Sequence, residues 1–425
     1  MIQPIRIRQH DDLRLPSTAG PGLEAKLAAV NDALRARAVE SLAELLPGLD
    51  LAAFAQATDS APLTISRFES ASIVERLDPI GFLDRYLGAT HLLSPGQIRL
   101  ARSRELAPSV DYLTARREWP IGRSIVNQAG LIRALRAGHS VILDGIDGYW
   151  SELAEITCSF ERVFGWKFNV NGYLSATPTQ AFGTHWDDHE VVIIQLINSK
   201  RWAIAAPENP SMVASLHPNE NRMDREATWD GLFTVGMGMY IPRGWAHAVQ
   251  ATEGLTFHIT VSCKRPTVLD MMRFQARSLS DGAPICVGDL LGEQGDRLVR
   301  DFTDSLVGDE SLEPTFSRFA AQMRLRMPAR FTRGSLRMAP LLESDSSRLR
   351  DPYGGGWLIL GQPAEGDAVI AAGGSAWRCE EETLSLLLAV ARAGALTLED
   401  ARRFGFGAAV LEDVANQGLL ELVPG

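Results

Sequence analysis

The spacing of two histidines and one aspartate constrains this chain more than any other feature of its sequence. His185-Trp186-Asp187 places an imidazole and a carboxylate two residues apart, and His247 follows after the segment 241–246. Side chains two positions apart point to the same side of an extended strand. We therefore expect His185 and Asp187 to face one metal ion together, while Trp186 points away. The fold must then bring His247 to the same place.

Two histidines and one carboxylate form the facial triad of non-haem Fe(II) sites, which leaves coordination positions free for other ligands. An isolated His-x-Asp is weak evidence, because the pair recurs by chance in chains of this length. The three groups together are more specific, since the first two lie at the mouth of one predicted strand and the third follows another. We predict that His185, Asp187 and His247 bind a metal ion.

The overall composition indicates an ordinary globular protein with room for several domains. The chain has 425 residues, of which 45% are hydrophobic and 22% charged, and its net charge is −10. This negative charge makes nucleic acid an unlikely partner. No segment approaches 18 uncharged apolar residues, and the first residues lack a secretory pattern, so we expect no membrane association and a cytoplasmic location.

The cysteines give no sign of a structural metal site or of a disulfide framework. Cys158, Cys263, Cys286 and Cys379 are scattered and show no Cys-x-x-Cys spacing. We expect them to be reduced, buried thiols.

Hydrophobic periodicity predicts helices at the front of the chain and short strands behind them. Residues 23–46 have the three- and four-residue apolar spacing of an amphipathic helix, and shorter helices are expected near 51–57 and 79–87. Residues 1–120 are therefore expected to be a mostly helical N-terminal region. Further helices are predicted at 127–137 and 149–164.

Residues 121–265 have the pattern of a β-rich core. Short apolar or alternating runs separated by turn residues predict strands, and Asn198-Ser199-Lys200 has the form of a hairpin-like connection. Strands with ligands at their ends are typical of a jelly-roll or cupin fold. The predicted strands are 141–146, 168–175, 191–196, 201–205, 233–236, 239–242 and 256–263.

The rest of the chain is expected to form two more regions. Residues 266–345 contain four predicted helices, at 268–276, 285–291, 296–306 and 312–324, and suit packing or a homodimer. Residues 346–425 end in three short helices and a β element, the outline of a winged helix. The acidic residues of this last region argue against DNA binding. The expected fold class is α+β.

Residues 169–207 and 233–263 resemble the JmjC-type cupin core of the bacterial and eukaryotic ribosomal oxygenases. The shared pattern is Asn-x-Tyr-Leu-x-x-x-Pro, then Phe-Gly-x-His-x-Asp-Asp-His, then an apolar strand ending in Gln, a basic residue and Trp. These enzymes are Fe(II)- and 2-oxoglutarate-dependent protein hydroxylases. The resemblance implies that His185, Asp187 and His247 bind Fe(II), and that Lys200 pairs with the distal carboxylate of 2-oxoglutarate. A solvated turn lysine is the alternative for Lys200.

Other polar residues near these positions are candidates for the same site. Thr260 and His258 share one face of the strand 256–263 and can hydrogen-bond the co-substrate if this face is interior, as can Asn171. For His258, a hydrogen-bonded core histidine is the alternative. Tyr173 and Gln195 are candidate substrate contacts, although Tyr173 also suits a core aromatic. His189 is a competing metal ligand, but we favour a substrate contact.

The chain departs from the family pattern in places that concern the substrate. It lacks a clear Trp-x-x-x-Pro before the core, its first 60 residues are additional, and Arg-Gly-Trp-Ala precedes His247 where apolar and Pro residues are more usual. The resemblance implies hydroxylation of a side chain in a protein or peptide, and these departures concern which substrate is used. The same chemistry on a small metabolite or natural-product peptide is one alternative, and a non-catalytic metal-binding cupin is another.

Overall fold

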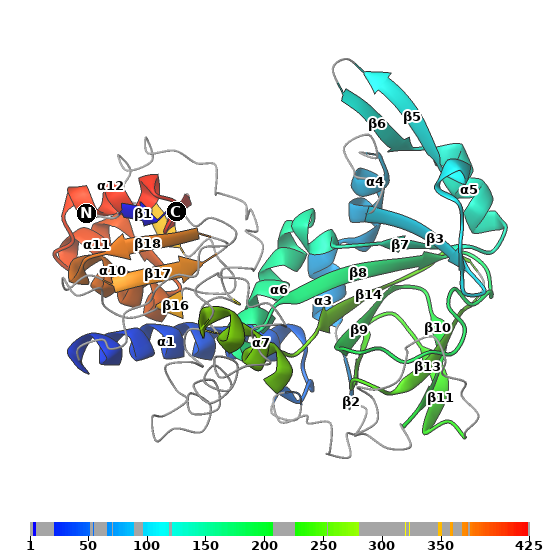
Figure 1. The fold of residues 1–425 in the computed structure, drawn as a ribbon, viewed down its shortest axis with the longest axis horizontal. Coiled ribbons are helices and arrows are strands. Elements are labelled where there is room, and N and C mark those ends of the chain that lie inside the picture. Colours follow the sequence, from blue (N-terminus) through cyan, green and yellow to red (C-terminus); the bar gives the residue numbers. More distant parts are fainter. Residues whose placement is uncertain are drawn as a thin grey trace, which may run out of the picture. The chain divides into compact units, whose positions relative to one another are not determined.

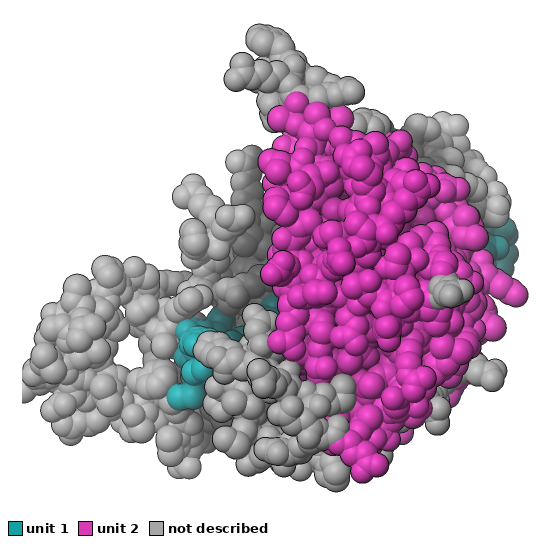
Figure 2. Space-filling view, turned by 90° about the vertical axis from the view of Figure 1, so that its right-hand side faces the viewer, with its two compact units in different colours: residues 1–37, 165–167, 265–425 teal, residues 38–164, 168–264 magenta. Residues whose placement is uncertain are grey.

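The structure is a computed structural model of the 425-residue chain, and the description covers part of it. The described residues are 3–5, 21–51, 54, 66–69, 71–88, 97–118, 121–206, 226–252, 254–279, 319, 323, 347–350, 358–359, 368–372 and 375–423. The chain divides into two compact units, coloured separately in Figure 2: unit 1 is 1–37, 165–167 and 265–425, and unit 2 is 38–164 and 168–264.

Unit 2 contains two antiparallel sheets that form the predicted jelly-roll core (Figure 1). The larger sheet has eight strands in the order β2-β12-β9-β14-β8-β7-β3-β4, and the smaller has the order β11-β10-β13. The larger sheet comprises β2 (Ser66–Glu69), β3 (Ile98–Arg102), β4 (Glu105–Leu106), β7 (Ser140–Leu143), β8 (Phe168–Ser175), β9 (Glu190–Ile197), β12 (Met237–Ile241) and β14 (Thr256–Cys263). The smaller comprises β10 (Lys200–Ala205), β11 (Trp229–Phe233) and β13 (Ala246–Ala251).

The predicted hairpin at residues 198–200 is wrong, because β9 and β10 belong to different sheets. β9 pairs with β12 and β14, whereas β10 pairs with β11 and β13. Asn198 has a positive φ of 51°, and its side-chain amide donates to the Leu255 carbonyl. The turn therefore carries the chain from one sheet to the other.

One face of the larger sheet packs against an apolar core that is rich in aromatic rings. Phe54 lies 4.8 Å from Tyr240 of β12 and 4.5 Å from Phe164 of α6 (Ser151–Phe164), between ring centroids. Phe160 of α6 packs 5.3 Å from Phe168 of β8. Burial of these side chains contributes roughly 1.5 to 3 kcal/mol each. The polar residues described below lie on the opposite face of the same sheet.

The expectation of a mostly helical front region holds for the described residues up to 88 and fails beyond them. The helices there are α1 (Pro21–Leu45), α3 (Ala71–Leu77) and α4 (Pro79–Gly88). Residues 97–118 contain β3, β4, the 3-10 helix η3 (Ser109–Asp111) and β5 (Leu113–Glu118), which pairs with β6 (Ile121–Val126). These strands were missed because several are short and rich in arginine, a residue with no strand signature.

Two predicted helices of unit 2 are confirmed with similar bounds. α5 (Gln128–Arg136) begins after Asn127, whose side chain accepts a hydrogen bond from the Gly130 N–H. α6 follows the 3-10 helix η4 (Ile146–Gly148). Cys158, Cys263 and Cys379 are buried and form no disulfide bond with one another, as expected, and Cys286 lies outside the described residues.

Unit 1 contains helices and two small sheets. Among the described residues, it includes α1 up to residue 37, α7 (Val268–Leu279), α10 (Glu381–Ala393), α11 (Leu398–Arg403) and α12 (Ala408–Asn416). Its sheets have the orders β1-β18-β17-β16 and β19-β15-β20. The strands are β1 (Gln3–Ile5), β15 (Arg348–Arg350), β16 (Leu358–Ile359), β17 (Ala368–Ala372), β18 (Ser375–Cys379), β19 (Ala395–Thr397) and β20 (Glu421–Val423).

The C-terminal helices pack around a core to which Leu386, Val390 and Leu411 contribute. Three short helices followed by a strand agree with the expected outline, and the winged-helix assignment itself stays a prediction. Of the four helices predicted in 266–345, the first is α7. The other three lie outside the described residues apart from Phe319 and Met323, and the homodimer stays a prediction. Within the part of the chain that the structure describes, no helix is long and apolar enough to cross a membrane.

We predict that Gly172→Ala destabilises unit 2. A Cβ at Gly172, in β8, would lie 2.8 Å from the ring of Phe257 and 3.2 Å from Ile146, both fully buried. Overpacking of this kind costs about 1 to 3 kcal/mol of unfolding free energy, which urea titration measures. Gly148→Ala is the matched control, because a Cβ there meets nothing within 4 Å. Equal stability of the two variants would contradict the packing described for this face.

Candidate metal centre

The His185 segment is a loop closed by one β-bridge, and the expectation of a regular strand here is wrong. β9 begins only at Glu190, after both His185 and Asp187. His185 and His247 form an isolated bridge: the His185 N–H donates to the His247 carbonyl at 3.1 Å, and the His247 N–H donates to the His185 carbonyl at 2.7 Å. The Gly244 N–H also donates to the Asp187 carbonyl at 3.0 Å. Main-chain hydrogen bonds therefore join the two segments that carry the donors.

Both imidazoles are oriented by backbone carbonyls. The Nδ1 atom of His185 lies 3.1 Å from the Gly183 carbonyl, and that of His247 lies 3.1 Å from the Trp245 carbonyl. A carbonyl only accepts hydrogen bonds, so each Nδ1 carries a proton and each neutral ring keeps its lone pair on Nε2. Such partners fix the tautomer and orientation of metal-binding histidines.

The three predicted ligands come together as one donor set. The Nε2 atoms of His185 and His247 lie 3.9 Å and 3.6 Å from the nearest carboxylate oxygen of Asp187. One ligand atom from each residue lies within 4.8 Å of the others. His247 is buried and the other two are half-buried. The arrangement suits one cation bound by two nitrogens and one oxygen.

The electrostatics favour the charge states that a cation needs. Burial, with the neighbouring His185 acting in the same direction, lowers the pKa of His247 to about 4. Burial raises the pKa of Asp187, but the nearby His247, His189 and His185 outweigh it, so the pKa is lowered overall. Near neutral pH the site therefore presents a neutral His247 imidazole and an ionised carboxylate.

His189 lies on the outer side of this group. Its Nε2 atom is 3.8 Å from an Asp187 oxygen, and the residue is half-buried. It does not belong to the three-ligand cluster found among the described residues. This placement suits the favoured expectation of a contact beside the metal ligands.

Lys200 is a buried amine, not a solvated turn residue. Its side chain is 2% exposed, and its ammonium donates to the Tyr173 carbonyl at 2.9 Å and the Ser175 hydroxyl at 3.4 Å. Within the described residues no carboxylate pairs with it. Burial lowers its pKa from 10.5 to about 7. A buried charge without a counter-charge is costly unless a ligand supplies one.

The polar face of β14 points into the jelly roll, as the conditional prediction required. His258 is 4% exposed, stacks on Tyr173 with 4.8 Å between ring centroids, and lies opposite Gln195. Thr260 shares this face and lies opposite Asn171 in the β8–β14 register. The register between β9 and β14 shifts at Phe257 and His258. Bulges of this kind often re-aim side chains beside functional sites.

Several buried polar atoms on and around this face have no hydrogen-bond partner among the described residues. They are the His258 Nδ1, the Gln195 Oε1 and the Trp202 Nε1 atoms. Buried polar atoms of this kind need a partner, so their cluster marks a place that a polar ligand can satisfy. Burial lowers the pKa of His258 well below its usual value, and Lys200 acts in the same direction.

Asn171 and Tyr173 interact with other residues of the protein more than expected. The Asn171 side-chain oxygen accepts a hydrogen bond from the Gly145 N–H at 3.1 Å. Burial raises the pKa of the Tyr173 hydroxyl, and Asp187 raises it further. Both residues lie beside the site, and Asn171 also supports the turn before η4.

The sequence analysis missed three residues at the site. Trp202 stacks on His247 at 5.9 Å between centroids, and Ser175 contacts Lys200. Each lies two residues from a residue already predicted, so strand alternation could have found them. Arg104 donates to the Thr184 carbonyl at 3.1 Å, beside His185, from a backbone with φ of 74°. No sequence pattern indicates that contact.

We predict that Lys200 makes stability depend on pH. Its folded pKa of about 7 lies below the unfolded value of 10.5, so the unfolded chain binds more protons between these values. Stability therefore rises with pH across this window, by about 1.4 kcal/mol per pH unit. In Lys200→Met this contribution is lost, and the variant is the more stable protein near pH 7.

Urea unfolding at several pH values from 7 to 10 measures this effect. Lys167→Met is the control, because the Lys167 side chain is exposed and its loss should leave the slope unchanged. Identical pH slopes for the parent protein and Lys200→Met would show that the buried ammonium is neutralised in some other way.

Comparisons with known proteins agree with this geometry. Residues 150–271 match the model of the JmjC domain. The Brugia malayi bifunctional lysine-specific demethylase and histidyl-hydroxylase NO66 is 28% identical over 163 residues, which are 35% of this chain and 23% of the relative. The Mus musculus ribosomal oxygenase 2 is 33% identical over 116 residues, which are 27% of this chain and 25% of the relative.

Among solved structures, the Escherichia coli ribosomal oxygenase YcfD aligns with 17% identity and a TM-score of 0.46, over 80% of this chain and 90% of that one. The chain spans less than a third of the length of the curated relatives that it matches. Residues 150–271 of this chain thus match a JmjC domain, and about a third of the chain is similar to the ribosomal oxygenases.

Proposed function

We propose that this protein is an Fe(II)- and 2-oxoglutarate-dependent oxygenase that hydroxylates a side chain of a protein or peptide. One observation carries the proposal: a buried lysine without an acidic partner among the described residues lies on the same face of the smaller sheet as His247, a member of the His-Asp-His group. A metal site alone is shared by cupins of many functions. The uncompensated cation adds the requirement for an anionic ligand next to it.

The donor set fits Fe(II). Neutral imidazole nitrogens from His185 and His247, with one oxygen from Asp187, leave open positions on a six-coordinate ion. When bound, Fe(II) would provide these positions for a 2-oxo acid and O₂. The backbone carbonyls behind each Nδ1 hold the rings in place, so the chain supplies a preformed site.

Lys200 would bind the distal carboxylate of 2-oxoglutarate. Its ammonium is held at the start of β10 by the Tyr173 carbonyl and the Ser175 hydroxyl, and both of these are acceptors. A ligand carboxylate would supply the negative charge that neither of these acceptors carries. The rings of His258 and Trp202 lie 5.3 Å apart between centroids. The His258 Nδ1 atom and the Trp202 Nε1 atom have no hydrogen-bond partner among the described residues and could bind a polar ligand.

The substrate class rests on the relatives. Their printed names describe a histidyl-hydroxylase and ribosomal oxygenases, which favours a side chain of a ribosomal protein. The same chemistry on a small metabolite or natural-product peptide is the alternative, as is a metal-binding cupin without activity. Mass spectrometry of ribosomal proteins for an added oxygen separates the first two, and metal-dependent succinate formation separates both from the third.

We predict that His185→Ala, Asp187→Ala and His247→Ala each abolish succinate formation and iron binding. The donors lie in loops and at the start of β13, so the fold should survive each change. Iron content, turnover and circular dichroism measure the three effects. His139→Ala is a control for loss of a histidine outside the site. Full activity in any of the three variants would exclude the proposed triad.

We predict that Lys200→Ala weakens 2-oxoglutarate binding by about ten- to a hundredfold. A hydrogen bond to a charged group contributes about 1.5 to 3 kcal/mol, and each 1.4 kcal/mol corresponds to about tenfold in affinity. Iron affinity should barely change. Lys200→Arg should keep part of the 2-oxoglutarate affinity, because it retains the charge with altered reach. Unchanged half-saturation by 2-oxoglutarate in Lys200→Ala would place the carboxylate elsewhere.

A further inference from the structure

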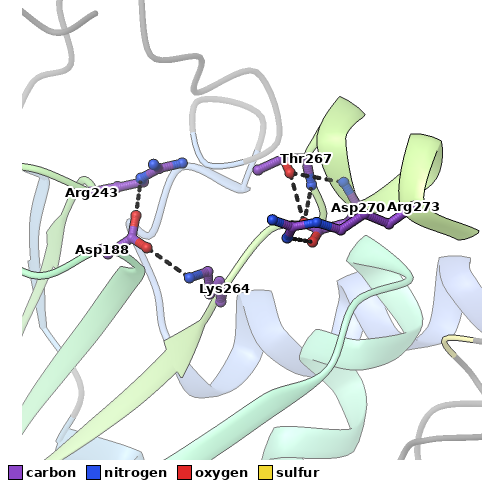
Figure 3. Close-up of polar contacts among 6 residues, drawn as sticks. All are labelled: Asp188, Arg243, Lys264, Thr267, Asp270 and Arg273. Carbon is purple, nitrogen blue, oxygen red and sulfur yellow. Dashed lines mark hydrogen bonds and ion pairs between the residues drawn. The ribbon is translucent and has the colours of Figure 1, made fainter. Parts of the chain in front are cut away.

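Asp188 is a second carboxylate directly after Asp187, but cations occupy both of its oxygens. The Arg243 Nε atom lies 2.7 Å from the Asp188 Oδ1 atom, and the Lys264 Nζ atom lies 2.7 Å from Oδ2 (Figure 3). The Lys264 contact is a hydrogen bond, whereas the Arg243 contact is an ion pair without hydrogen-bond alignment. Asp188 is therefore engaged by the protein and is not available as a fourth metal ligand.

The Asp188 contacts join three separate segments of unit 2. Asp188 lies in the loop before β9, Arg243 in the turn before β13, and Lys264 directly after β14. In Figure 3, Arg243 and Lys264 approach the Asp188 carboxylate from different sides. The loop provides Asp187, and the turn leads to His247, so the pair with Arg243 links the two segments that carry ligands.

A second carboxylate holds the same arginine through its backbone. One oxygen of Glu190 lies 3.3 Å from the Arg243 N–H and 2.6 Å from the Tyr240 hydroxyl, which donates to it. Arg243 is thus held at its main chain by Glu190 and at its side chain by Asp188. Its side chain is 14% exposed, whereas that of Lys264 is 66% exposed. Solvent therefore screens the ion pair between Arg243 and Asp188 less than the one between Lys264 and Asp188.

We propose that Asp188 and Arg243 form a positioning pair that keeps Asp187 and His247 at metal-binding distance. This inference rests on the proposed metal site. The backbone bridge between His185 and His247 holds the two ligand-bearing segments together. The Asp188–Arg243 pair then fixes the path of the chain after the bridge, where Asp187 lies. Arg243 also balances the negative charge of Asp188, which would otherwise act on the neighbouring carboxylate of Asp187.

The test measures Mn(II) binding in the absence of 2-oxoglutarate, by electron paramagnetic resonance of the free ion. Asp188→Asn and Arg243→Gln should each raise the dissociation constant about ten- to a hundredfold, the usual cost of losing a partner that orients a metal site. Because both changes remove one pair, the double variant should lose little more than either single variant.

Lys264→Met is the matched control. It removes the other cation from the same carboxylate, at an exposed position, and should leave the Mn(II) dissociation constant within about twofold, as surface ion pairs contribute little. The melting temperature of the metal-free protein provides the second readout: Asp188→Asn and Arg243→Gln should both remain folded at the temperature of the binding assay, so that weaker Mn(II) binding does not come from unfolding.

Three results would overturn the proposal. They are an unchanged dissociation constant in Asp188→Asn, an equal loss in Lys264→Met, and weaker binding that only follows a collapse of the metal-free fold in both Asp188→Asn and Arg243→Gln. Failure of the parent protein to bind Mn(II) would instead contradict the proposed function, so the two failures are distinguishable.

Discussion

The main-chain bridge between His185 and His247 is the constraint on which the site depends. It connects the loop before β9, in the larger sheet, with β13, in the smaller sheet. Because the two hydrogen bonds involve only backbone atoms, the separation of the two imidazoles is set by the fold and not by flexible side chains. The jelly roll therefore closes at the point where its metal ligands meet.

The two faces of the larger sheet explain why the interior can be polar. One face carries Phe168 and Tyr240 against a cluster of aromatic rings, and these provide much of the apolar burial. The opposite face carries His258 and Thr260 toward the smaller sheet, whose Lys200 donates to the Tyr173 carbonyl and the Ser175 hydroxyl of β8. A core that is stabilised on one side can keep buried polar groups on the other, where a ligand has to be recognised.

Regular elements were predictable because their periodicity is local. β8 and β14 have the predicted bounds, and alternation placed His258 and Thr260 on one face. What alternation could not decide was which sheet a strand joins: β9 and β10 read as a hairpin, yet pair with different partners. Contacts between distant segments, such as Arg104 with Thr184, leave no trace in local sequence. The three candidate ligands could be predicted to meet because their residue types are restricted by coordination chemistry, even though the strand assumed for them is a loop.

The burial of Lys200 couples the site to the proton concentration of its surroundings. A lysine with a pKa of about 7 is present in both charge states at neutral pH. When an anion binds next to it, the charged state is favoured, and the protein must take up a fraction of a proton from solvent for each ligand captured. Under the proposed function, co-substrate binding is then a proton-consuming equilibrium that weakens as the medium becomes more alkaline. An amine that is buried for geometric reasons thereby links the capture of a metabolite to pH.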